Sequence, residues 1–240
     1  MKFVKAENYE ELSRMAAGII AGQIREDASE GKRTVLGLAT GSSPIGTYDE
    51  LIRMNKAGEL DFSTVTTVNL DEYVGLGPDH PQGYRYFMNE HLFNHVNIDM
   101  KNTFVPDGLA SDLNAACRAY DENIASLGGI TLQLLGIGPD GHIGFNEPCS
   151  YFTGPTHVTP LHESTVAANS RFFASANDVP KKAVTMGIAP IMAAKKIVLV
   201  ANGKAKKDVL MRAVEGNIDP LLPASILQLH PDVTVIFSEN

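Results

Sequence analysis

The 240-residue sequence contains only two cysteines, Cys117 and Cys149, and they do not have the spacing of a metal site. This scarcity favours a reducing cytoplasm over a disulfide-bonded secreted fold. Acidic residues outnumber basic residues by 28 to 20, which gives a formal net charge of −8. Such a chain has little non-specific attraction for nucleic acid or for an anionic membrane, so we expect neither as a partner. An anionic substrate would need positive charge concentrated at its site.

Long hydrophobic runs are also missing. No stretch approaches the roughly 20 apolar residues of a membrane-spanning helix. Residues 1–8 lack the apolar core of a signal peptide. The chain shows no internal repeat, no low-complexity tract and no linker rich in Pro, Gly or Ser. We therefore predict a single domain over residues 1–240, located in the cytoplasm and long enough to build a sizeable core.

What the sequence does contain is an alternation of apolar, strand-like runs with amphipathic, helix-like segments. The segments predicted as strands are 34–39, 65–70, 131–135, 197–200 and 233–237. The segments predicted as helices are 7–28, 44–56, 111–127 and 204–214. Apolar strands separated by helices indicate an α/β fold with a parallel sheet covered on both faces. The polar, turn-rich segment 148–175 interrupts this regularity, and we predict that it is an irregular lid beside an active site.

The most informative segment, residues 136–148, follows a predicted strand and places Asp140, His142 and Glu147 among several glycines. Ligands of α/β sheets bind at the carboxyl ends of the strands, and glycines let the backbone come close to a ligand. An imidazole with two carboxylates supplies a base and two groups that can orient it. We interpret His142 as a catalytic acid or base. One alternative is an ordinary histidine on a surface loop. Another is a metal site, but no second His or Cys lies nearby to complete its set of ligands.

The same segment matches a dinucleotide-binding fingerprint that starts at Gly136, with Glu163 following at a suitable distance. That fingerprint must open a helix. The prolines and glycines between residues 139 and 148 make this stretch a poor helix. The sequence therefore disfavours a dinucleotide cofactor and a redox dehydrogenase.

A second polar cluster, Thr40, Gly41, Ser42 and Ser43, joins the predicted strand 34–39 to a helix. Free N–H groups and hydroxyls at a helix N-terminus form an anion site. The cluster nearly matches a nucleotide P-loop but lacks its lysine, which favours the phosphate of a small metabolite over a nucleoside triphosphate. An ordinary strand-to-helix turn is the alternative.

A third cluster contains Asp71 and Glu72, directly after the strand 65–70. A buried carboxylate with a raised pKa can remove a proton from carbon. Because side chains alternate along an extended chain, we expect only one of the two to face the site. A solvated acidic turn is the alternative. Arg171 and Lys204 are candidates for the positive charge of a phosphate site, although each by itself is typical of a solvated surface residue.

Taken together, these motifs resemble the glucosamine-6-phosphate deaminase (isomerase) family. The resemblance runs from residues 38–44 to residues 227–231, and the combination of 69–73, 140–148 and 168–173 makes it specific. It implies a Rossmann-like, three-layer α/β sandwich with a mostly parallel central sheet. It also implies a hydrolase of amino-sugar catabolism without cofactor or metal, which converts glucosamine 6-phosphate and water to fructose 6-phosphate and ammonia.

The resemblance further implies a role for each site residue. His142 would open the pyranose ring, with Asp140 and Glu147 orienting it, and Asp71 would move the C2 proton to C1 through an enolamine. The residues implied in holding the substrate phosphate are Thr40, Gly41, Ser42, Ser43, Arg171 and Lys204.

Two features depart from family members that are regulated by N-acetylglucosamine 6-phosphate. Residues 150–166 contain no Lys or Arg, where regulated members carry basic residues, and the chain ends at Asn240 without their longer tail. We therefore expect the short, non-allosteric type, as a monomer or a small homo-oligomer.

Three alternatives on the same fold remain. A 6-phosphogluconolactonase would not need Asp71 as a base for carbon, and a sugar-phosphate isomerase would release no ammonia. A non-enzymatic sensor of sugar phosphates would keep the phosphate loop but would not need the titratable trio of Asp140, His142 and Glu147.

Overall fold

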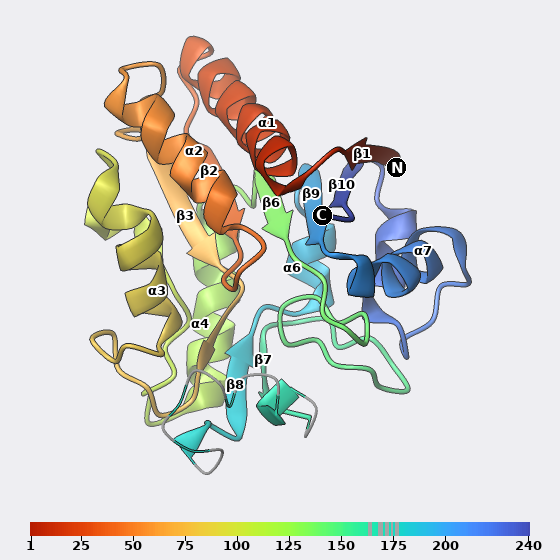
Figure 1. Ribbon diagram of the computed structural model, residues 1–240. Helices are drawn as coiled ribbons and strands as arrows, with labels where there is room; N and C mark the ends of the chain where they lie inside the picture. The colour runs from red at the N-terminus through yellow and green to blue at the C-terminus, as the bar shows by residue number, and fades with distance from the viewer. Residues whose placement is uncertain (163–164, 168–169, 171–172, 174, 176–177) are drawn as a thin grey trace.

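The protein, described as a computed structural model, is built on a seven-stranded sheet in which all neighbouring strands are parallel. The structure describes residues 1–162, 165–167, 170, 173, 175 and 178–240. In spatial order the strands are β1 (Lys2–Ala6), β10 (Val233–Ser238), β9 (Lys196–Asn202), β6 (Leu132–Leu135), β2 (Thr34–Leu38), β3 (Val65–Asn69) and β5 (Thr103–Phe104). Their carboxyl ends share one edge (Figure 1).

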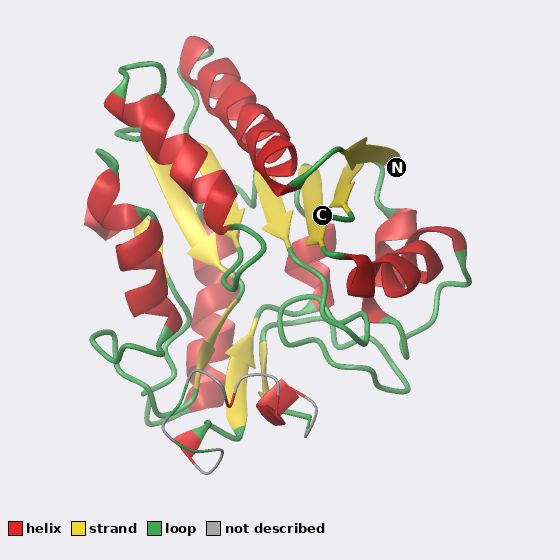
Figure 2. Ribbon diagram, in the orientation of Figure 1, coloured by secondary structure: helices red, strands yellow, loops and turns green. Residues whose placement is uncertain are grey.

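Helices cover both faces of this sheet and give three layers (Figure 2). One face carries α1 (Tyr9–Ser29), α2 (Ile45–Lys56) and α3 (Tyr84–His91). The other carries α4 (Leu113–Ser126), α6 (Ile188–Met192) and α7 (Lys207–Glu215). The short 3-10 segments are η1 (Phe93–His95), η2 (Met100–Asn102), η5 (Lys204–Lys206) and η6 (Pro223–Leu229). The predicted α/β sandwich with a mostly parallel sheet is confirmed.

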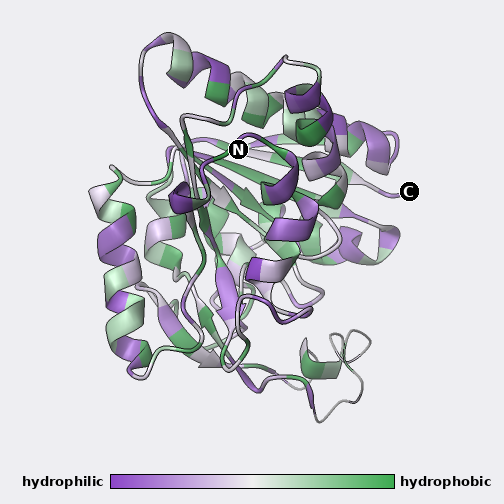
Figure 3. Cartoon of the chain, turned by 90° about the vertical axis from the view of Figure 1, so that its left-hand side faces the viewer, coloured by the Kyte–Doolittle hydropathy of each residue, from purple (hydrophilic) through white to green (hydrophobic). Residues whose placement is uncertain are grey.

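Strands β2, β3 and β6 are buried along their whole length, as expected for parallel strands with helices on both sides. Figure 3 shows mainly hydrophobic residues on the central strands and many hydrophilic ones on the outer helix surfaces. The helix predicted over residues 7–28 shows how local sequence sets an element. Asn8 accepts a hydrogen bond from the N–H of Glu11 at 2.9 Å and starts α1. The apolar stripe of α1 then faces the sheet.

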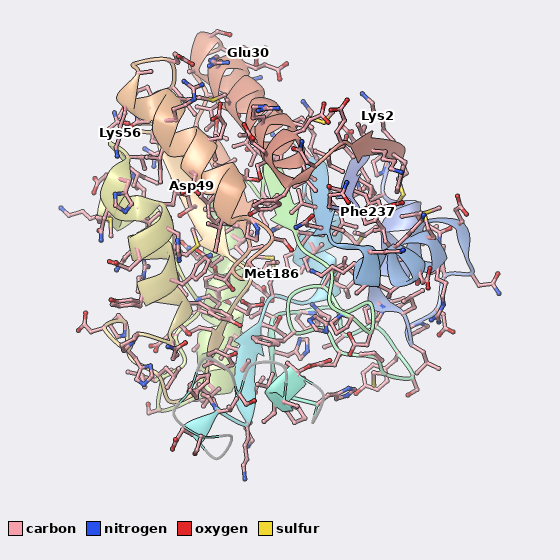
Figure 4. All side chains as sticks on the ribbon, viewed as in Figure 1. Lys2, Glu30, Asp49, Lys56, Met186 and Phe237 are labelled. Carbon is pink, nitrogen blue, oxygen red and sulfur yellow. The ribbon has the colours of Figure 1, made fainter. Side chains whose placement is uncertain are left out.

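A second, antiparallel sheet lies at the carboxyl edge of the large one, in the order β4 (Asp71–Tyr73), β8 (Lys182–Thr185) and β7 (His157–Pro160). Only Leu70 separates β3 from β4. At this junction Met186, which Figure 4 labels, donates its N–H to the carbonyl of Leu70 at 2.6 Å. The prediction of an irregular segment over 148–175 is wrong at β7, because these residues find a partner strand in β8.

The strands β1, β4, β5 and β8 and the helices α3 and α6 were not predicted from the sequence either. In the part of the chain that the structure describes, no helix combines the length and the apolarity needed to cross a bilayer.

Candidate functional site

A cleft of about 300 Å³ opens at the carboxyl edge of the large sheet. The three polar clusters found in the sequence all contribute to its lining. They are the loop Thr40–Ser43 after β2, Asp71 on β4, and the glycine-rich segment after β6 with His142. The parallel sheet thus brings together residues that are far apart in the chain.

His142 lies between two carboxylates. Its Nδ1 is 2.7 Å from Asp140 Oδ1 and 3.6 Å from Glu147 Oε2. The His142 side chain is 18% exposed and Glu147 is 5% exposed. Burial alone would raise the pKa of Asp140, but the hydrogen bond and the charge of His142 outweigh burial and lower that pKa. With Nδ1 held by Asp140, the other ring nitrogen of His142 has no hydrogen-bond partner among the described residues and can exchange a proton with a ligand.

Gly138 is needed because the imidazole of His142 lies directly against its backbone. A Cβ at position 138 would come within 2.2 Å of the His142 ring. Gly144, with φ of +58°, lies against Asp71, whose Oδ2 would be 3.4 Å from an added Cβ. The glycines of this segment therefore make room for the acid–base groups themselves.

Residues 139–148 contain no helix, which agrees with the exclusion of a dinucleotide-binding turn. Among the described residues, Asp140, His142 and Glu147 form the one group whose potential metal-ligand atoms lie within 4.8 Å of one another. The close contact between Asp140 and Nδ1 of His142 is also the arrangement that orients an imidazole for acid–base chemistry.

Asp71 is 6% exposed and lines the cleft. Burial, and then the neighbouring charge of Glu72, raise the pKa of Asp71 well above its usual value of 3.8. A carboxylate in this environment is a stronger base than one in water, which suits proton removal from carbon.

Glu72 does not line the cleft and instead caps α3. Its carboxylate accepts the N–H groups of Tyr73 at 2.8 Å, Tyr84 at 2.9 Å and Arg85 at 2.9 Å. The expected alternation of Asp71 and Glu72 is thus observed. Glu72 ties β4 to the helix that brings Tyr84 into the cleft.

The loop Thr40–Ser43 precedes α2 and is fixed by Tyr9. The Tyr9 hydroxyl lies 3.0 Å from the Ser42 carbonyl, to which it can donate, and accepts the N–H of Gly46 at 2.8 Å. Gly41 adopts φ of +95°, a conformation that favours glycine. The loop therefore presents backbone and hydroxyl groups at a helix N-terminus, as an anion site requires.

Lys206 is the described lysine that lines the cleft, and its Nζ donates to Ser43 Oγ at 3.2 Å. Burial lowers the pKa of Lys206. Lys204, which the sequence analysis selected, is exposed and does not line the cleft. Arg171 lies outside the described residues.

Three cleft residues were not identified from the sequence: Lys206, Tyr84 and Thr165. Lys206 lies two positions after the predicted Lys204 in the same turn. The direction in which each side chain leaves that turn would have been the signal that distinguishes them. Tyr84 stacks on Phe145 with ring centroids 5.9 Å apart. The two residues are far apart in the sequence, so no local sequence pattern predicts this contact.

A parallel sheet that carries an imidazole, carboxylates and a loop at a helix N-terminus along one edge is typical of the class of α/β proteins that bind small anionic ligands there. The chain belongs to the glucosamine-6-phosphate isomerase/6-phosphogluconolactonase family, whose model matches residues 7–236. It is 57% identical over 236 residues to a glucosamine-6-phosphate deaminase of Lachnoclostridium phytofermentans, covering 98% of both chains. It is 54% identical over 240 residues to the deaminase of Clostridium perfringens (strain 13), covering 100% of this chain and 98% of that one.

Two solved structures have the same fold. A monomeric glucosamine-6-phosphate deaminase superimposes with a TM-score of 0.95 at 48% identity, over 99% of this chain and 97% of that one. A 6-phosphogluconolactonase from Thermotoga maritima gives a TM-score of 0.80 at 19% identity, over 100% and 99% of the two chains. The second likeness concerns the fold alone.

Proposed function

We propose that this protein is a glucosamine-6-phosphate deaminase, which converts glucosamine 6-phosphate and water to fructose 6-phosphate and ammonia. The observation that carries the proposal is the presence of two separate proton-transfer groups in one cleft. His142 stands on a loop between two carboxylates, and Asp71 stands on a strand, buried and with a raised pKa. Relatives at 54–57% identity over nearly the whole chain bear the deaminase name.

In the first step His142 acts on the closed ring. It moves a proton from the O1 hydroxyl to the ring oxygen, which breaks the bond between C1 and that oxygen and gives the open-chain aldehyde. Asp140 and Glu147 orient the imidazole and stabilise its charged form.

In the second step Asp71 acts on carbon. It removes the C2 proton to form an enolamine and returns a proton at C1, which gives the imine of fructose 6-phosphate. Water adds to this imine at C2, and ammonia leaves. The reaction is balanced without a cofactor or a metal ion.

The phosphate is bound by Thr40, Gly41, Ser42 and Ser43 together with Lys206, which we propose in place of Lys204. Arg171 keeps the phosphate-binding role that the resemblance implies. Lysine suits this site as a point charge, and the loop adds backbone N–H groups from a helix N-terminus. We propose that the enzyme works in the cytoplasm as a monomer or small homo-oligomer, since the similar structure at 48% identity is a monomeric deaminase.

A 6-phosphogluconolactonase is the second candidate because the family model includes that activity. Lactone hydrolysis requires activation of a water molecule and no base for carbon. The buried Asp71 therefore favours the deaminase.

The purified protein with glucosamine 6-phosphate and no added cofactor should release ammonia and fructose 6-phosphate in equal amounts. Asp71→Asn, which keeps the shape of the side chain, should lower kcat by about 100-fold or more. This variant also controls for contaminating activity. Hydrolysis of 6-phosphogluconolactone with no release of ammonia would overturn the proposal.

A further inference from the structure

The carboxylate of Glu147 is buried and is contacted by residues beyond the His142 loop. Its Oε1 accepts a hydrogen bond from Thr165 Oγ1 at 2.6 Å. Its Oε2 lies 3.6 Å from His142 Nδ1 and 3.7 Å from His162 Nδ1. No described residue donates a hydrogen bond to this second oxygen. One oxygen of the carboxylate is thus held, and the other lies between two imidazoles.

The two residues that contact Glu147 line different cavities. Thr165, which is 6% exposed, lines the substrate cleft. Glu147 and His162 line a neighbouring cavity of about 260 Å³. Thr165 and His162 thus approach different oxygens of the same carboxylate, and both come from the chain that follows β7.

A buried carboxylate keeps its orientation and its charge only with suitable partners. Asp140 occupies Nδ1 of His142 at 2.7 Å, so Glu147 reaches the imidazole only at the longer distance. A small rotation of Glu147 would carry Oε2 away from His142. The groups that resist this rotation are the hydroxyl of Thr165, 2.6 Å from Oε1, and the ring of His162, whose Nδ1 lies 3.7 Å from Oε2.

We propose that Thr165 and His162 are positioning residues that hold the Glu147 carboxylate against His142, so that ring opening depends on them. This inference rests on the proposed deaminase function. It assigns these two residues to the ring-opening step and leaves proton removal by Asp71 unchanged.

The test is a double-mutant cycle on kcat, carried out after ammonia release by the wild-type protein has been established. Thr165→Val removes the hydroxyl and should lower kcat about tenfold, because a hydrogen bond to a charged group is lost. His162→Gln should lower kcat about threefold, because that side chain is 46% exposed and solvent weakens its contact with Glu147. Thr165→Ser keeps the hydroxyl and should restore kcat to within about twofold of wild type.

Two further readouts separate positioning from general damage. The reduced, open-chain 2-amino-2-deoxyhexitol 6-phosphate needs no ring opening, so its Kd should stay within about twofold of wild type in every variant. If Thr165 acts through Glu147, then Glu147→Gln combined with Thr165→Val should be no slower than Glu147→Gln alone. A fully additive loss of kcat in this double variant would overturn the proposal. A wild-type kcat in Thr165→Val or in His162→Gln would show that the residue concerned does not position Glu147. Failure of the proposed function would appear earlier, as a wild-type protein that releases no ammonia.

Discussion

Lys206 brings positive charge to the cleft of a protein whose net charge is −8. Its ammonium lies 3.2 Å from Ser43 Oγ, at the loop that precedes α2. Lys204 and Lys206 belong to the same 3-10 turn, in which residues two positions apart point in directions about 120° apart. For this reason one lysine faces the cleft and the other faces solvent. Lys204 was predicted from its position after a strand, and that position does not reveal this rotation.

We expect Lys206→Ala to raise KM for glucosamine 6-phosphate about tenfold or more, since a charge-assisted contact to the phosphate is lost. Lys204→Ala is the matched control and should leave KM within about twofold of wild type, as for an exposed surface charge. Steady-state kinetics on both variants at fixed ionic strength would measure the difference. Equal increases in KM would show that the turn is arranged differently when substrate binds.

At the scale of elements, Glu72 connects β4 to α3 through three backbone N–H groups. An amide offers these donors one oxygen only, and its NH₂ group would face other donors. Glu72→Gln should therefore reduce the free energy of unfolding by about 1–3 kcal/mol. Urea denaturation at pH 7 measures this loss.

Glu59→Gln serves as the control for that variant. Glu59 lies on the surface, 48% exposed and 3.4 Å from Arg53, so the change should cost less than about 1 kcal/mol. If both variants were equally stable, the link between β4 and α3 would contribute nothing measurable.

The elements that the sequence predicted correctly are long or fully buried, such as α1 and β3. Their patterns are set by the faces that they bury, and those patterns can be read locally. Four of the missed strands, β4, β5, β7 and β8, have only two to four residues. β1 is exposed over most of its length at the sheet edge, and β7 ends in a proline, so neither carries a strand pattern of its own. Such strands form because a partner strand is present, which only the tertiary structure provides.

At the scale of the whole molecule, Asp71 should make stability depend on pH. Its raised pKa means that between pH 3.8 and that pKa the folded protein holds a proton that the unfolded chain has released. The free energy of unfolding therefore falls as pH rises through this window. Above this pH window Asp71 is ionised in the folded protein, and the free energy of unfolding is lowered by the full cost of burying its charge.

Asp71→Asn removes this cost and should be more stable than wild type at pH 8, with a gain that shrinks toward pH 4. Each 1 kcal/mol gained corresponds to about 2–4 °C in Tm for a chain of this size. Thermal unfolding of both proteins from pH 4 to pH 8 would measure it. A variant less stable than wild type at pH 8 would mean that the carboxylate is better solvated than its burial indicates.

The general position of the site was predictable because parallel strands present their carboxyl ends at one edge. This rule was enough to group Asp71, His142 and the loop Thr40–Ser43 in one cleft. It does not describe the contacts that support those groups, such as Glu72 on α3 or Thr165 on Glu147. Those contacts depend on how the second sheet and the chain around it lie against the first.

Strand β4 is connected to both sheets. It continues β3 of the large sheet after one residue, and it pairs with β8 of the small sheet, with Asp71 opposite Thr185. Asp71, which we propose as the base for carbon, cannot be relocated without altering both sheets, whereas His142 stands on a loop and depends on its side-chain neighbours. The surroundings of His142 can therefore be changed by exchanging side chains on a loop, whereas moving the carboxylate of Asp71 would require rebuilding the junction of the two sheets.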